Sequence, residues 1–136
     1  MTLVTLLEDL DCYNNLLVGD YGMKVLTWVL MGLVTVAMIG AGLAKLTGVE
    51  MVLASFATLG LPAWFGTFIG VAEVAGGIAL WHRKTSLLAA SGLSIIMVGA
   101  VYYHVFYTPL SEALPAAVLL VICAWIAKRK GTGVIG

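Results

Sequence analysis

Four long apolar runs, separated by short polar breaks, account for most of the chain. They are residues 25–44, 62–81, 86–106 and 112–127. The first holds twenty residues without a charged side chain. A helix of that length rises about 30 Å, the thickness of the hydrocarbon core of a bilayer. The pattern predicts an all-α membrane protein, a bundle of four transmembrane helices.

The amino-terminal segment, residues 1–22, has the periodicity of an amphipathic helix. Its apolar side chains recur three or four positions apart, at Leu3, Leu6, Leu7, Leu10, Tyr13 and Leu17. The opposite face is acidic, with Glu8 and Asp9, whereas helices that lie on anionic lipid are usually rich in Lys and Arg. We predict a surface helix that docks on a partner protein. The alternative is a leader without stable structure, because Met23-Lys24 resembles a chain start.

Residues 48–61 form an apolar segment that is too short to cross a bilayer. Gly60 is a helix-end signal, and Pro62 is typical of a helix start. We predict a short helix in the membrane interface between spans 1 and 2. The expected organisation is an acidic amphipathic segment (1–22), a four-helix membrane domain (23–130) and a flexible tail (131–136).

Composition supports the membrane class and excludes others. Hydrophobic residues make up 62% and charged residues 10% of the chain, and the mean hydropathy is +1.08. The net charge is zero, so no basic surface favours nucleic acid. Cys12 and Cys123 lie far apart without a Cys/His cluster, so we expect no metal site, and we interpret Cys123 as a packing residue.

The basic residues indicate how the chain is oriented. Four spans put the amino terminus, the second turn and the carboxyl terminus on one side, which holds Lys24, Arg83, Lys84, Lys128, Arg129 and Lys130. The other side holds only Lys45 among the bases. By the positive-inside rule we expect a multi-pass protein of the cell inner (plasma) membrane with both termini in the cytoplasm.

One acid lies deep in an apolar run. Gly66, Gly70, Glu73 and Gly77 fall on one helix face, so the side with the carboxylate also lets other helices approach closely. We expect this face to point into protein. An ionisable residue at such depth is by default a functional candidate. The alternative is an ion pair or a protonated carboxylic acid that only fixes helix packing.

Three ionisable residues from three different predicted helices are the site candidates: Lys45, Glu73 and His104. Glu73 falls about 16 Å below the outer surface, while the other two lie near helix ends. We therefore expect a water-mediated link from Lys45 to Glu73 in an outward-opening cavity. The expected rim is aromatic and consists of Trp64, Tyr102, Tyr103 and Tyr107.

Simpler roles remain open for two of these residues. Lys45 could be a flanking anchor that extends to the interface, and His104 could bridge water and lipid head groups. No catalytic triad spacing or phosphate loop accompanies them, so we do not expect enzymatic activity from the chain on its own.

The order of these features resembles that of the DoxX-like family of small four-helix membrane proteins. The resemblance rests on Ala41-Gly42-Leu-Ala-Lys45, Phe56-Ala-Thr-Leu-Gly60-Leu-Pro62 and Gly70-Val-Ala-Glu73-Val-Ala-Gly76-Gly77, followed by a small-residue helix that reaches His104. It covers about residues 25–128. It implies that Lys45, Glu73 and His104 are the functional positions. Some members resemble membrane subunits of thiosulfate:quinone or terminal oxidase systems, and others are linked to thiol redox complexes or to membrane-protein assembly.

The resemblance implies a scaffold more than a reaction. Our first expectation is an accessory or assembly subunit of a larger membrane complex, such as a redox complex, with the bilayer and that complex or a homo-oligomer as partners. The second is a quinone-linked oxidoreductase subunit, in which Lys45 and His104 bind the quinone and Glu73 and His104 relay a proton. The third is a small-molecule binder or carrier, with Trp64 and Tyr103 as further ligand contacts. No cysteine lies near these residues, which argues against direct thiol chemistry.

Overall fold

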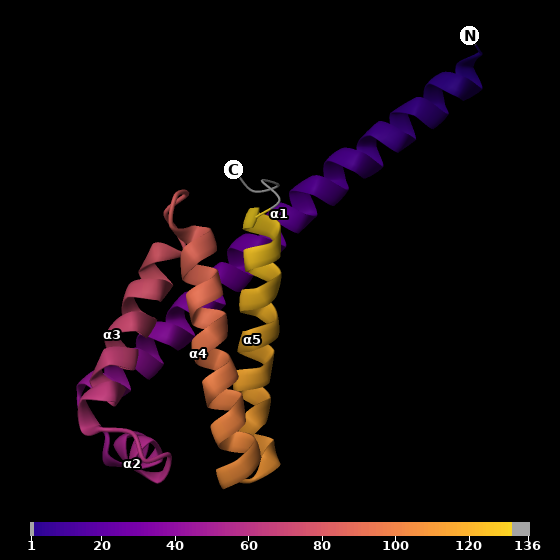
Figure 1. Ribbon diagram of the computed structural model, residues 1–136. Helices are drawn as coiled ribbons and strands as arrows, with labels where there is room; N and C mark the ends of the chain where they lie inside the picture. Colours follow the sequence, from indigo (N-terminus) through magenta and orange to yellow (C-terminus); the bar gives the residue numbers. More distant parts are fainter. Residues whose placement is uncertain (1, 132–136) are drawn as a thin grey trace. The chain divides into compact units, whose positions relative to one another are not determined.

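The structure, a computed structural model, describes residues 2–131, and all regular structure in that range is helical (Figure 1). Its helices are α1 (Leu3–Leu46), α2 (Glu50–Thr58), α3 (Ala63–Ala79), α4 (Ser86–Tyr107) and α5 (Leu110–Gly131). The all-α prediction is confirmed. Of the predicted flexible tail, residues 132–136 lie outside the described residues.

Three of these helices, α1, α4 and α5, are long and apolar enough to cross a membrane. The fourth predicted span corresponds to α3, which has 17 residues. It reaches the required length only together with α2, from which it is bent by 116°. The described chain therefore has three candidate spans, or four if the bent pair is one span.

The chain divides after Leu30 into two compact units. The described part of the first unit is a single stretch of α1, in which Lys24 pairs with Asp20 one turn earlier at 2.7 Å (Nζ to Oδ2). The second unit contains the rest of α1 and all the other helices.

The predicted amino-terminal helix and the first predicted span form one continuous helix, because α1 runs from Leu3 to Leu46. The pattern of the sequence changes from amphipathic to apolar near residue 22. That change alters what the helix faces, but it does not remove backbone hydrogen bonds. The two glycines there, Gly19 and Gly22, each cost only about 1 kcal/mol relative to alanine, and no proline precedes Pro62.

The short helix α2 matches the predicted helix within residues 48–61, and glycine turns set its position. Gly60 has φ 71°, and its N–H donates to the Ala57 carbonyl at 2.9 Å. The Leu61 N–H donates to the Phe56 carbonyl at 3.0 Å, which completes a Schellman motif. Gly48, with φ 74°, ends α1 with the same pair of bonds. Both turns need a left-handed residue, which glycine adopts without a steric penalty.

Helices α4 and α5 pack along each other and are joined by a tight connection. The Glu112 N–H donates to the Pro109 carbonyl at 2.9 Å in the first turn of α5. The helix therefore begins at Leu110.

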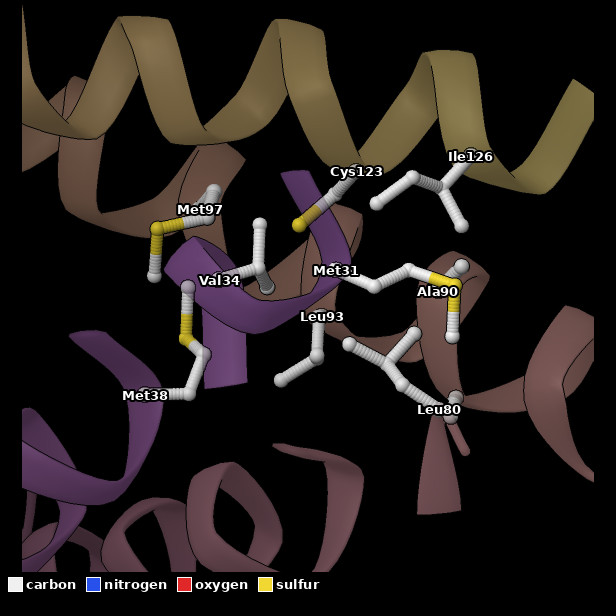
Figure 2. Close-up of a cluster of buried hydrophobic side chains, with 10 residues drawn as sticks. Met31, Val34, Met38, Leu80, Ala90, Leu93, Met97, Cys123 and Ile126 are labelled. Carbon is white, nitrogen blue, oxygen red and sulfur yellow. The ribbon is translucent and has the colours of Figure 1, made fainter. Parts of the chain in front are cut away.

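The core of the second unit lies between α1, α4 and α5 (Figure 2). Its side chains are small or flexible and come from all three helices and from the end of α3: Met31, Val34, Met38, Leu80, Ala89, Ala90, Leu93, Met97, Cys123 and Ile126. Cys123 is fully buried there, in agreement with its interpretation as a packing residue. Methionine adapts to irregular gaps between helices, which suits this position.

The buried face of α3 is the face that the sequence predicted. Its buried residues are Gly66, Gly70, Glu73 and Gly77. A Cβ atom added to Gly70 would lie 2.9 Å from the Gly42 carbonyl oxygen of α1, and one added to Gly42 would lie 2.7 Å from the Gly70 oxygen. The two backbones are therefore in contact at this crossing, as small residues permit.

A hydrogen-bonded link joins the same two helices nearer the end of α3. The Thr35 hydroxyl accepts from the Trp81 indole N–H at 2.8 Å, and it lies 3.1 Å from the Gly77 carbonyl oxygen and 2.8 Å from that of Met31. Because Thr35 meets Gly77 whereas Gly42 meets Gly70, α3 runs antiparallel to α1.

Thr35→Val should lower the free energy of unfolding by about 1 kcal/mol, since it keeps the shape of the side chain but removes the acceptor of the Trp81 bond. Thermal unfolding in mild detergent would measure the change. Thr58→Val is the matched control, because the Thr58 hydroxyl donates to the Ala54 carbonyl oxygen within its own helix. Equal melting temperatures for both variants would contradict a stabilising role for this link.

Candidate functional site

Lys45 and Glu73 form a direct ion pair between α1 and α3. Lys45 Nζ lies 2.7 Å from Glu73 Oε2, and the side chains are 13% and 2% exposed. Lys45 Nζ also donates to the Ala41 carbonyl oxygen at 3.4 Å, one turn back on its own helix. The expected water-mediated link is therefore wrong, and Lys45 turns inward instead of extending to the interface.

The direction of helical side chains explains the direct contact. Every Cα–Cβ bond in a helix tilts toward the amino terminus of that helix. Lys45 is near the carboxyl end of α1, so its side chain points back along α1, as the contact with Ala41 shows. Because α3 is antiparallel, Glu73 points the opposite way along the same crossing. The two side chains converge from different backbone depths.

The ion pair borders a cavity of about 530 Å³ in the second unit. This volume is within the range of pockets for small ligands, about 300–1,000 Å³. The lining comes from the end of α1, from α2, α3 and α4, and from the start of α5. It is largely apolar, with Met51, Val52, Phe56, Phe65, Ile69, Ile95, Ile96 and Ala100. Its polar members are Lys45, Ser55, Glu73, Tyr103, His104, Thr108 and Glu112.

His104 lines the same cavity and has polar partners at the connection between α4 and α5. Its Nδ1 lies 3.1 Å from the Thr108 hydroxyl oxygen and 3.9 Å from Glu112 Oε2. The Thr108 hydroxyl proton points to backbone carbonyl oxygens, that of His104 at 3.1 Å and that of Pro109 at 3.5 Å. The hydroxyl oxygen is then an acceptor for His104, so Nδ1 carries the proton and Nε2 is the acceptor in the neutral ring.

The cavity brings together Lys45, Glu73, His104 and Tyr103 from the predicted site. Tyr103 also contacts the His104 ring, with centroids 5.4 Å apart.

The other aromatic residues predicted at the rim are not among the lining residues. Trp64 is 64% exposed on α3 and packs edge-on against Phe65 and Phe68. Tyr102 and Tyr107 are about half exposed on α4.

Thr108 and Glu112 also line the cavity, and the sequence patterns did not identify them as site residues. The spacing of Thr108 could have indicated its contact, because it is four residues after His104, about one helical turn. Glu112 contacts His104 because a tight connection returns the chain to the same end of α4.

Glu73 and Lys45 have hydrogen-bonding groups that no residue in the range 2–131 uses. Glu73 Oε1 has no hydrogen-bond partner among residues 2–131, although Glu73 is 1% exposed and lines the cavity. A lysine ammonium has three donors, and Lys45 uses two. Within the same residues, no group of three or more His, Cys, Asp or Glu side chains could hold a metal ion. The site can thus both donate to and accept from a bound polar group.

A family model described as the DoxX-like family matches residues 29–126, which include every polar residue of this cavity. The chain belongs to the DoxX-like family. A relative of this DoxX-like chain is the Bacillus subtilis (strain 168) protein named Uncharacterized protein YdgD. The two are 28% identical over 97 residues, which cover 67% of this chain and 85% of the relative. No solved structure matches the chain.

Proposed function

We propose that this DoxX-like membrane protein binds a lipophilic small molecule with a polar head group, and that the ligand is a quinone in its oxidised or reduced form. The observation that carries the proposal is the buried Lys45–Glu73 pair, which leaves Glu73 Oε1 and one lysine donor available at the wall of an apolar cavity. The unused acceptor of Glu73 can therefore bond to a polar group of a ligand in the cavity.

The chemistry of a quinone matches these groups. The carbonyl oxygens of the oxidised form accept hydrogen bonds, which Lys45 can donate. The hydroxyl groups of the reduced form donate them, and Glu73 Oε1 and the Nε2 of neutral His104 can accept. The apolar lining suits the ring and the tail. This is the common design of small-molecule sites, mostly apolar with a few polar groups that fix orientation.

The same proposal includes four spans, with α3 as the second. Its support is the antiparallel packing of α3 against residues 35–42 of α1, which lie in the middle of an apolar run. Leu80 comes shortly before the basic residues Arg83 and Lys84, and Ile126 comes shortly before the basic run 128–130. Leu80 and Ile126 belong to one core cluster. Both basic runs are then on one side, and the positive-inside rule makes that side the cytoplasm of a plasma-membrane protein.

Membership in a larger redox complex is the second candidate, as an accessory or assembly subunit. It is favoured by the first unit, because a single helix has no second layer of its own to bury the apolar face that begins with Leu3, Leu6 and Leu7. A partner protein would bury that face. Deletion of residues 1–21 should then release the protein from its complex, and unchanged complex formation would contradict this role.

A binding titration with a short-chain ubiquinone analogue tests the quinone proposal. Gly99 lines the cavity and Gly92 does not, although both are on α4 and a Cβ atom at either position meets open space. Gly99→Leu should therefore weaken binding by about tenfold or more by occupying the cavity, whereas Gly92→Leu should bind like the wild type. Failure of the wild-type protein to bind the analogue, or equal binding by both variants, would overturn the proposal.

A further inference from the structure

The cavity is open on the side of α4. Ile95 lines the cavity, although 74% of its surface is exposed. Gly99, about one turn further along α4, also lines the cavity and is exposed, and a Cβ atom added there would meet nothing within 4 Å. A residue that lines a cavity and is also exposed marks the place where the cavity reaches the surface. The cavity therefore opens beside Ile95 and Gly99.

The packing of α3 against α4 explains this opening. The two helices are in close contact near the turn that joins them, where a Cβ atom added to Gly76 would lie 2.8 Å from Leu93 Cδ2. Beyond this contact the two helices diverge (Figure 1). The cavity lining on α3, which includes Phe65 and Ile69, lies on the diverging side, as does Ile95 on α4. The opening is thus a gap between two helices that touch only near their connection.

The opening lies at the depth of the hydrocarbon core. Helix α4 has 22 residues, enough to cross a core of about 30 Å, and Ile95 is near its middle. No residue of α4 between Ser86 and Tyr103 is charged. The polar lining residues His104 and Thr108 come later, at the end of α4 and just after it. The polar groups and the opening are therefore at different positions along α4.

A second exposed lining residue, Met51, belongs to α2 and is 83% exposed. It follows Glu50, an exposed acid, and α2 has only 9 residues, too few to cross the core. Because a charged side chain is costly within the hydrocarbon, an exit beside Met51 would lead to the membrane interface. An apolar chain is therefore better matched by the opening at Ile95.

We propose that the opening between α3 and α4 is a lateral portal to the bilayer, and that the ligand is a long-chain isoprenoid quinone whose tail remains in the lipid. This inference rests on the proposed quinone site. A cavity of about 530 Å³ has the size for a drug-sized ligand, so it holds the head group but not a long tail. The head group enters from the bilayer toward the polar residues, and the tail leaves past Ile95 and Gly99.

Equilibrium titrations in lipid nanodiscs test the portal, with a short-chain ubiquinone analogue and a long-chain ubiquinone. Both affinities are expressed per mole fraction of ligand in the bilayer. Lipid tails are as apolar as leucine side chains, so a tail that stays in lipid neither gains nor loses by binding. The wild-type protein should therefore bind the two ligands with affinities within about threefold of each other.

Ile95→Trp should weaken binding of the long-chain ligand about tenfold more than binding of the short-chain ligand, because the tail must pass a narrowed gap. Leu88→Trp is the matched control. Leu88 is two turns earlier on the same face of α4, is 75% exposed and lies outside the cavity lining. This control variant should keep the wild-type ratio of the two affinities.

A measurement on the wild-type protein does not depend on the folding of any variant. A long-chain ubiquinone with a photoreactive diazirine on its tail should label residues of α3 and α4 beside the opening. Labelling confined to α2, or a loss of long-chain binding in Met51→Trp but not in Ile95→Trp, would place the exit beside α2 and overturn the portal.

The outcomes also distinguish this inference from the function on which it rests. If the wild-type protein binds neither ligand, the quinone proposal itself is overturned. If it binds the short-chain analogue but not the long-chain ubiquinone, or if Ile95→Trp keeps the wild-type ratio, the portal is overturned and the quinone site remains.

Discussion

Lys45→Met is expected to lower the free energy of unfolding by about 3–5 kcal/mol, the usual effect of leaving one partner of a buried ion pair alone. Methionine has nearly the volume of the lysine stem, so loss of packing contributes little. The effect comes from Glu73, which is 1% exposed on the glycine face of α3 and would be left as a buried acid without its basic partner. Unfolding by a denaturing detergent, followed by circular dichroism, measures the change.

Two companion variants test the reason for this effect. Glu73→Met should be less damaging than Lys45→Met, because Lys45 is 13% exposed and its long side chain can turn toward the interface. The double variant Lys45→Met/Glu73→Met should recover most of the stability, since well-packed apolar pairs often replace buried ion pairs without loss. Equal stability of the wild type and Lys45→Met would show that Glu73 does not depend on the lysine.

Gly42→Leu should have the second large effect, a loss of about 3 kcal/mol or more, or failure to fold. A Cβ atom at this position would lie 2.7 Å from the Gly70 carbonyl oxygen and 3.2 Å from the Val74 amide nitrogen. Both are backbone atoms of α3, which cannot rotate away as a flexible side chain can. The helices would have to separate, and the Lys45–Glu73 contact beside the crossing would break.

Gly40→Leu is the matched control for this crossing. It adds the same side chain to the same helix two residues earlier, where a Cβ atom meets nothing within 4 Å. Folded yield and melting temperature in mild detergent compare the two variants. Comparable behaviour of Gly42→Leu and Gly40→Leu would show that α1 and α3 do not depend on close backbone contact.

The sequence was sufficient for features that depend on local pattern. The spacing of Gly66, Gly70, Glu73 and Gly77 identified the buried face of α3, because helical periodicity alone decides which residues share a face. Gly60 marked the end of α2, because a left-handed turn there favours glycine.

Contacts that depend on how helices approach each other in space could not be predicted from local pattern. The depth of Glu73 was counted along the backbone, which omits the opposite tilt of side chains on antiparallel helices, and so the direct contact with Lys45 was missed. The aromatic rim assumed that Trp64 faces inward, but an interfacial tryptophan satisfies the same pattern when it faces outward. Glu112 joins the site only because the turn after α4 returns the chain to His104, which residue spacing by itself does not reveal.

The close spacing of the Lys45 and Glu73 charges also determines how the site responds to membrane voltage. Moving one elementary charge across the whole bilayer against a potential of 100 mV requires work of about 2.3 kcal/mol. Here two opposite charges lie 2.7 Å apart, so any movement of the pair carries them through nearly the same part of the field, and the two contributions cancel. An uncharged ligand that enters beside the pair therefore moves almost no net charge. Its occupancy of the protein should be the same in energised and in depolarised membranes.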